Sequence, residues 1–179
     1  MFNDIEQGYE LEIKYWGADH KPNQKPLPPS RWQTKIKIDI SFSEKLITSP
    51  VFKPILHNYT DKKMINQLVP VYSLIEIISE KIRALLQRNR PRDIYDIWFL
   101  SNTFSFSQYQ FINELLNIKA KNKNIEIADL NSFINEDKGK KIKRAWHKSL
   151  GGHLPEFELP DFDKTYQEVY IFIKNILNS

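Results

Sequence analysis

The chain has 179 residues, 41% of them hydrophobic and 27% charged, so it can bury a core and its composition is not that of a disordered protein. It contains no cysteine, which excludes disulfide bonds and thiolate metal sites. The sequence also shows no signal peptide and no apolar run that could span a membrane, so we expect a cytoplasmic protein. The net charge of +4 favours an anionic partner such as a nucleotide, RNA or an acidic protein.

Two strands are predicted near the N-terminus. Apolar and polar residues alternate with period two over residues 9–15 and again over residues 35–42, which is typical of strands with one buried face. Residues 17–31 between them are polar and carry four prolines, which predicts a loop. The simplest arrangement is an antiparallel hairpin whose apolar face packs on helices.

Asp39 lies inside the second predicted strand, a position that is unfavourable for aspartate. It shares its face of the strand with Lys35 and Lys37, and two interpretations are open. In the first, the face is solvated and Asp39 pairs with one of the lysines. In the second, the rigid strand holds the carboxylate in a position to ligate a divalent cation.

The next segment is predicted to contain little regular structure. Residues 43–60 are expected to be loops with short apolar pieces near Val51 and Ile55. Residues 69–72 form a short extended segment, in which Pro70 suits the edge of a sheet because proline has no N–H to donate.

A helix is predicted from Ser73, which is followed three residues later by Glu76 in a capping-box pattern. Its apolar stripe consists of Leu74, Ile75, Ile78, Ile82, Leu85 and Leu86. At about 100° per residue, the opposite face carries Glu76, Glu80, Arg83 and Gln87. Pro91 interrupts the pattern and is tolerated at a first helical position, so a second helix is expected from Pro91.

Charged residues gather at the junction of these two helices: Lys81 and Arg88 on the first, and Arg92, Asp93 and Asp96 on the second. A salt-bridged junction would explain the group. In that interpretation the helix dipole favours Asp93, and Arg92 forms a surface pair with Asp96. The alternative is a functional cluster.

Four further helical segments are predicted. The first begins at Ser107, which could cap it, and ends in the lysine-rich residues 119–124, which are expected to be solvated. The second covers residues 127–134, the third covers residues 138–149, and the fourth begins at Asp161. The third segment is basic and surrounds Trp146 with cations. Such a helix can contact RNA, although a solvated face around a core tryptophan is the commoner arrangement.

The pattern Lys81-x-x-Ala84-x-x-x-Arg88-x-x-x-Arg92-Asp93-x-x-Asp96 resembles the last motif of the AbiEii/AbiGii-type toxins. These are nucleotidyltransferase-fold proteins of bacterial abortive-infection and toxin–antitoxin systems. Residues 35–42 resemble the strand that carries the third metal-binding carboxylate of such folds. The resemblance implies an α+β fold, with a partial nucleotidyltransferase-like part and its small antiparallel sheet at residues 1–72, and a helical bundle at residues 73–179.

The resemblance also implies roles for individual residues. The catalytic residues would be Asp39, Lys81 and Asp93, with Asp96 supporting the site. The nucleotide-binding cations would be Lys37, Lys81, Arg88 and Arg92. Asp39 would ligate Mg²⁺, the substrate would be a nucleoside triphosphate, and the partners would include an acceptor such as tRNA and a cognate antitoxin protein.

Family members place a Gly-Ser or Gly-Gly pair and an Asp-x-Asp pair ahead of the strand that corresponds to residues 9–15. Only eight residues precede that strand in this sequence, so the chain is expected to lack the segment with these motifs. The alternative to an active enzyme is a catalytically inactive relative that acts as a nucleotide-binding or protein-interaction module.

Overall fold

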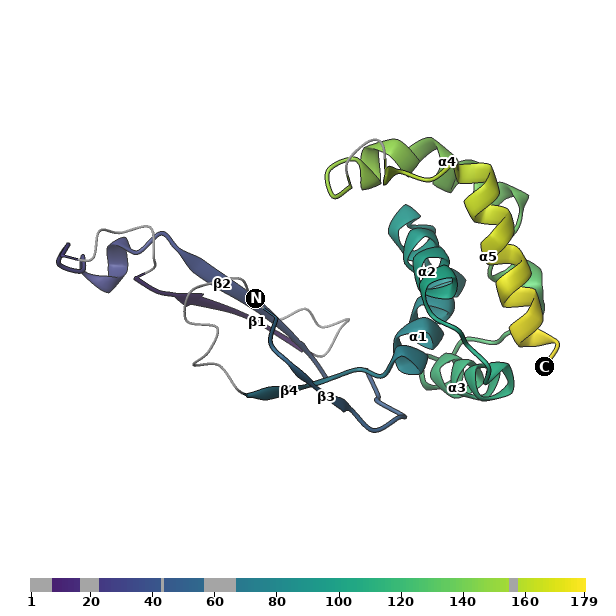
Figure 1. Cartoon of the computed structure of the whole chain (residues 1–179), viewed down its shortest axis with the longest axis horizontal. Coiled ribbons are helices and arrows are strands. Elements are labelled where there is room, and N and C mark those ends of the chain that lie inside the picture. Colours follow the sequence, from purple (N-terminus) through teal and green to yellow (C-terminus); the bar gives the residue numbers. More distant parts are fainter. Residues whose placement is uncertain (1–7, 17–22, 43, 57–66, 155–157) are drawn as a thin grey trace. The chain divides into compact units, whose positions relative to one another are not determined.

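The computed structural model describes residues 8–16, 23–42, 44–56, 67–154 and 158–179. The chain divides into two compact units, residues 1–45 and residues 46–179. The described residues form two antiparallel sheets of two strands each and five α-helices, most of them C-terminal (Figure 1). The predicted α+β class is therefore confirmed, while the division into functional parts at residue 72 stays a prediction.

The first unit contains a β-hairpin. Strand β1 (Gly8–Lys14) pairs antiparallel with β2 (Lys35–Ser41), which confirms both predicted strands and their pairing. A short 3₁₀ turn (Pro29–Arg31) lies in the connection. The strands place Tyr9, Leu11, Ile13, Ile36, Ile38 and Ile40 in the predicted apolar alternation, each of them 38–51% exposed. No described residue of this unit is buried, and the packing of the apolar face on helices stays a prediction.

The second unit begins with a smaller sheet. Strand β3 (Val51–Pro54) pairs antiparallel with β4 (Leu68–Val71), and Phe52 lies opposite Pro70. Loops were predicted over residues 43–60, so β3 is a correction. Four residues are too few to show an alternation, and the segment is extended because β4 pairs with it. Pro70 lies in a two-stranded sheet, where each strand has an edge that needs no partner.

Five helices follow, and together they are called the helical body: α1 (Leu74–Gln87), α2 (Pro91–Thr103), α3 (Tyr109–Asn122), α4 (Glu136–Leu150) and α5 (Phe162–Leu177). Ser73 and Asp161 cap α1 and α5 as predicted. Helix α3 begins two residues after Ser107 without a side-chain cap, so the predicted cap is wrong. The helix predicted over residues 127–134 is only a 3₁₀ turn at Leu130–Ser132.

The core lies among these helices. Its buried side chains include Ile78, Ile82, Ile94, Ile97, Ile112, Leu116, Ile142, Trp146, Val169 and Ile173. Trp146 is 1% exposed and donates its indole N–H to the carbonyl of Pro160 at 3.1 Å, so its one polar group is satisfied. The predicted core role of Trp146 is confirmed. None of the helices in the described part of the chain has the length and apolar character needed to cross a bilayer.

Candidate functional site

The first part of the candidate site is an ion pair that joins α1 to α2. Asp93 lies in the first turn of α2 and is 1% exposed. Arg88 ends α1, and its Nε and Nη2 donate to the two carboxylate oxygens of Asp93 at 2.7 and 2.9 Å. Paired charge-assisted bonds of this kind offset the loss of hydration of a buried carboxylate, and the dipole of α2 adds to them.

Lys81 extends this pair into a four-residue group. Its ammonium lies 2.6 Å from a carboxylate oxygen of Asp96 and 3.7 Å from one of Asp93. Lys81, Arg88, Asp93 and Asp96 together are called the junction cluster. The surface pair predicted between Arg92 and Asp96 is wrong, because Asp96 pairs with Lys81 and the Arg92 guanidinium contacts the imidazole of His153 instead.

The electrostatics of the junction cluster are balanced, with two cations facing two carboxylates. Both oxygens of Asp93 accept bonds from Arg88, so in this geometry Asp93 holds the guanidinium in place. Lys81 is 31% exposed in its side chain. Part of this side chain is therefore in contact with solvent.

The remaining predicted residues, Lys37 and Asp39, lie on β2 in the first unit. Lys37 is 3.3 Å from Glu10, and Lys35 is 2.9 Å from Glu12. Both are diagonal cross-strand pairs. The pairing of Asp39 with one of these lysines is therefore wrong. Asp39 is exposed, and its side chain makes no hydrogen bond or ion pair with a described residue.

Asp39 lies directly opposite Glu10 in the register, but two exposed carboxylates do not make a metal centre. In the described part of the chain, no three His, Asp or Glu side chains lie close enough to hold a metal ion together. The residues that the structure describes therefore do not fit a two-metal site. A site shared by Asp39, Lys37 and the junction cluster stays a prediction.

A second polar cluster, which the sequence patterns did not predict, is buried between α1 and α3. Glu76 and Lys119 are 2% and 4% exposed, and their charged atoms lie 2.6 Å apart. The backbone N–H groups of Ile47 and Thr48 donate to the Glu76 carboxylate at 3.3 and 3.0 Å. Burial alone would raise the pKa of Glu76, but the hydrogen bonds from Lys119 and Thr48 outweigh it and leave this pKa below its usual value.

This buried pair corrects two expectations. The Ser73 hydroxyl accepts from the Glu76 N–H as predicted, but the Glu76 carboxylate binds the segment at residues 47–48 and Lys119 rather than closing a capping box. Lys119 is buried, although the lysine-rich end of α3 was predicted to be solvated. A pattern that could have revealed it is the buried stripe of α3, since Lys119 follows Ile112 and Leu116 at helical spacing.

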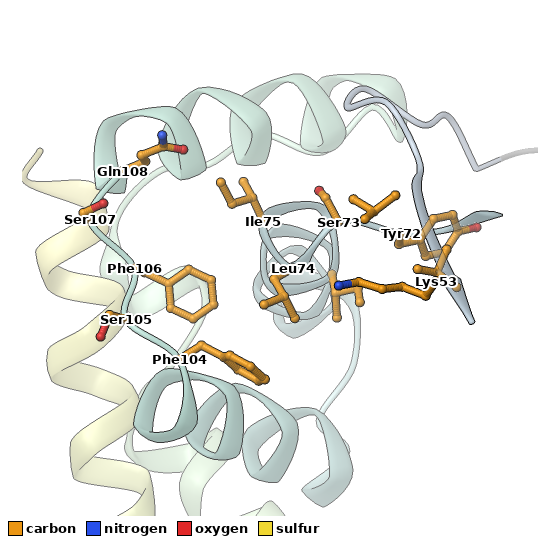
Figure 2. Close-up of a pocket in the computed structure, with 13 residues that line it drawn as sticks. Lys53, Tyr72, Ser73, Leu74, Ile75, Phe104, Ser105, Phe106, Ser107 and Gln108 are labelled. Atoms are coloured by element: carbon orange, nitrogen blue, oxygen red, sulfur yellow. The ribbon is translucent and has the colours of Figure 1, made fainter. Parts of the chain in front are cut away.

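The second unit also contains a cavity of about 680 Å³ between the β3–β4 sheet, the start of α1 and the α2–α3 connection (Figure 2). Its apolar lining consists of Val51, Val71, Leu74, Ile75, Ile77, Phe104 and Phe106. Among the described residues that line it, Lys53 alone is charged, and Figure 2 shows its ammonium extending toward Leu74. None of the predicted site residues lines this cavity.

Comparison with known proteins agrees with the resemblance carried by residues 81–96. The chain matches the family described as "Nucleotidyl transferase AbiEii toxin, Type IV TA system" over residues 6–168. This range includes both the hairpin and the junction cluster. No curated protein and no solved structure matches the chain.

Proposed function

Because the chain belongs to the AbiEii family of nucleotidyltransferase toxins, we propose that it binds a nucleoside triphosphate with Mg²⁺ and transfers a nucleotide to an acceptor such as tRNA in the cytoplasm. Its family is of the type IV toxin–antitoxin kind, which implies a cognate antitoxin. The observation that supports the proposal most directly is the junction cluster. It joins four of the six residues that define the pattern over residues 81–96.

The junction cluster suits phosphate binding. Phosphoryl and nucleotidyl transfer depend on cations that are already in place around the phosphates when charge shifts in the transition state. Arg88 is held by a buried carboxylate, and Lys81 is held between Asp93 and Asp96. In the proposed complex the triphosphate replaces Asp96 as the partner of Lys81, and Arg92 on the exposed side of α2 adds a further cation.

Asp39 is the candidate Mg²⁺ ligand in the proposal, with Lys37 beside it on β2. Mg²⁺ binds carboxylate and phosphate oxygens and would neutralise charge on the triphosphate. One exposed carboxylate does not build a two-metal site, so no catalytic step is assigned to the metal. The chemistry assigned to this chain is the binding and orientation of phosphates by the cations of the second unit.

The test is to incubate the purified protein with Mg²⁺, labelled nucleoside triphosphates and total tRNA. We expect label in the tRNA, and a loss of about 10²-fold in Lys81→Ala, the size found when one transition-state donor is removed. Lys164→Ala is the matched control, since Lys164 is exposed and its charge lies 4.0 Å from Glu168. Transfer that survives Lys81→Ala unchanged would contradict the site. If the folded protein bound nucleotide but transferred none to any acceptor, the inactive binding module would replace the enzyme.

A further inference from the structure

Helix α4 carries the positive excess of the whole chain. Its 15 residues include six Lys or Arg and two Asp or Glu, for a net charge of +4. The complete chain also has a net charge of +4, so everything outside α4 is balanced. A charge excess concentrated on one helix is an electrostatic feature that can attract a polyanion.

Three of the six cations have structural partners. The ammonium of Lys138 donates to the main-chain carbonyls of Leu85 and Ser132, both at 2.6 Å. Lys140 pairs with a glutamate one turn earlier on α4, and Lys143 pairs with an aspartate on α5. The charges of these three lysines therefore already have partners within the helical body.

The other three cations are Lys141, Arg144 and Lys148, which are called the α4 stripe. They are exposed, and none of their side chains forms a hydrogen bond or ion pair with a described residue. At spacings of three and four residues they lie on one face, about 4.5 and 6 Å apart along the axis. Asp137 bounds the stripe at its N-terminal end.

The C-terminal end of the stripe leads toward the candidate site. Helix α4 ends at Leu150, and His153 follows shortly after it. The imidazole of His153 contacts the guanidinium of Arg92 in the first turn of α2, and both residues are exposed. The segment that follows the stripe thus contacts α2, the helix that carries Asp93 and Asp96.

We infer that the α4 stripe binds the phosphodiester backbone of a nucleic acid. Charges spaced regularly along a rigid helix suit the regular charges of a sugar–phosphate chain. Helix α4 exposes no Phe, Tyr or Trp on which a base could stack, so the contact is to the backbone and independent of sequence. The biological role of this binding, which is to hold the acceptor of the nucleotide, rests on the proposed function.

Two other partners fit less well. An anionic membrane would need an apolar side of the helix to insert, but the apolar side of α4 is buried through Ile142 and Trp146. An acidic protein would need an aromatic or aliphatic anchor in the middle of the surface, where lysine is normally depleted. The α4 stripe offers only cations.

The test measures binding of an RNA duplex and of a DNA duplex of the same sequence by fluorescence anisotropy over a range of salt concentrations, without nucleoside triphosphate. The variant is K141Q/R144Q/K148Q. The matched control K45Q/K121Q/K174Q removes the same charge from exposed lysines elsewhere. We expect the slope of log K against log salt to fall by about 2.7 in the variant, at about 0.9 per phosphate contact. The slope should be unchanged in K141R/K148R.

If the triple variant loses affinity for both duplexes, the stripe binds the sugar–phosphate backbone that the two share. If it loses affinity for the RNA duplex alone, the ligand of the stripe is RNA. The inference is overturned if the stripe variant and the control lose affinity equally, or if polyglutamate or anionic vesicles bind as tightly as the duplexes and lose as much in the variant. Circular dichroism checks folding, and R144E replaces the triple variant if that variant does not fold. A failure of the proposed function is separable, because this binding is measured without nucleoside triphosphate, and Lys81→Ala should lower transfer about 10²-fold while it leaves the binding intact.

Discussion

The β1–β2 hairpin and the helical body show equally regular patterns in the sequence, but they are stabilised in different ways. Every helix of the body contributes buried side chains, whereas no described residue of the hairpin is buried. The helical body contains the buried ion pair Glu76–Lys119, whereas the pair Lys35–Glu12 of the hairpin is exposed. Burial raises both the hydrophobic contribution of a side chain and the cost of removing one partner of an ion pair, so a clear pattern in the sequence does not by itself indicate a large contribution to stability.

The largest difference between the two regions is expected when one partner is removed from each kind of ion pair. Lys119→Met leaves the buried Glu76 carboxylate without its cation and should lower the free energy of unfolding by about 3–5 kcal/mol. The matched variant Lys35→Met should cost no more than about 1 kcal/mol, because its pair is exposed. Urea denaturation followed by circular dichroism measures both. Equal costs would show that Glu76 is satisfied by Ile47 and Thr48 alone.

The same comparison can be made with one apolar residue type. Ile82 is fully buried on α1, and Ile38 is 39% exposed on β2. Ile82→Ala should cost about 2–5 kcal/mol of unfolding free energy through lost burial and a residual cavity. Ile38→Ala should cost less than about 1 kcal/mol. The midpoint of urea denaturation measures both variants. A large shift of this midpoint in Ile38→Ala would show that the apolar face of the hairpin is covered in solution.

Acid should act on the helical body through Glu76. The carboxylate has a pKa below the ordinary 4.5, so its contribution to stability is present above that value and is lost as the pH falls through the folded-state pKa. Denaturation at a series of pH values from neutral to about pH 3 should therefore show a loss of stability that is weaker in Glu76→Gln. A hydrogen bond from Lys35 also lowers the pKa of Glu12, but Glu12→Gln should leave the acid dependence nearly unchanged, because solvent screens that pair.

The smallest effect is expected for a single hydrogen bond. The phenol of Tyr166 donates to the carbonyl of Asn135 at 2.8 Å, and burial raises the pKa of Tyr166 to about 12. Tyr166→Phe should cost about 1 kcal/mol of unfolding free energy. The comparable hairpin variant Trp32→Phe loses an exposed bond to Leu27 and should cost less than about 0.5 kcal/mol. Thermal denaturation resolves the two, and a larger loss for Trp32→Phe would reverse the comparison.

The parts of the fold that could be predicted are those determined by residues close in sequence. Alternation located β1 and β2, and apolar spacing with Pro91 separated α1 from α2 at the observed residues. The parts that could not be predicted depend on a distant partner. Strand β3 is extended because β4 pairs with it, and Lys119 is buried because Glu76 lies on the facing helix.

The candidate site divides in the same way. The pattern over residues 81–96 correctly indicated a cluster at the α1–α2 junction, because helical spacing fixes which side chains share a side. It did not indicate the pairing. Arg92 lies one turn before Asp96 on α2, but Asp96 pairs with Lys81 on the neighbouring helix, and Arg92 contacts His153 beyond the end of α4. The cavity beside Lys53 was missed for the same reason, as its walls come from three separate segments.

The pairing of Arg88 with Asp93 also has a consequence for proteolysis. Arg88, Arg90 and Arg92 lie within five residues, a sequence that an arginine-specific protease would be expected to cut. The side chain of Arg88 is held by Asp93, the bond after Arg90 precedes a proline, and the bond after Arg92 lies inside α2. We therefore expect limited trypsin digestion to leave the α1–α2 segment in one fragment. Asp93→Asn weakens the hold on Arg88 and should make the bond after Arg88 the first in this segment to be cut.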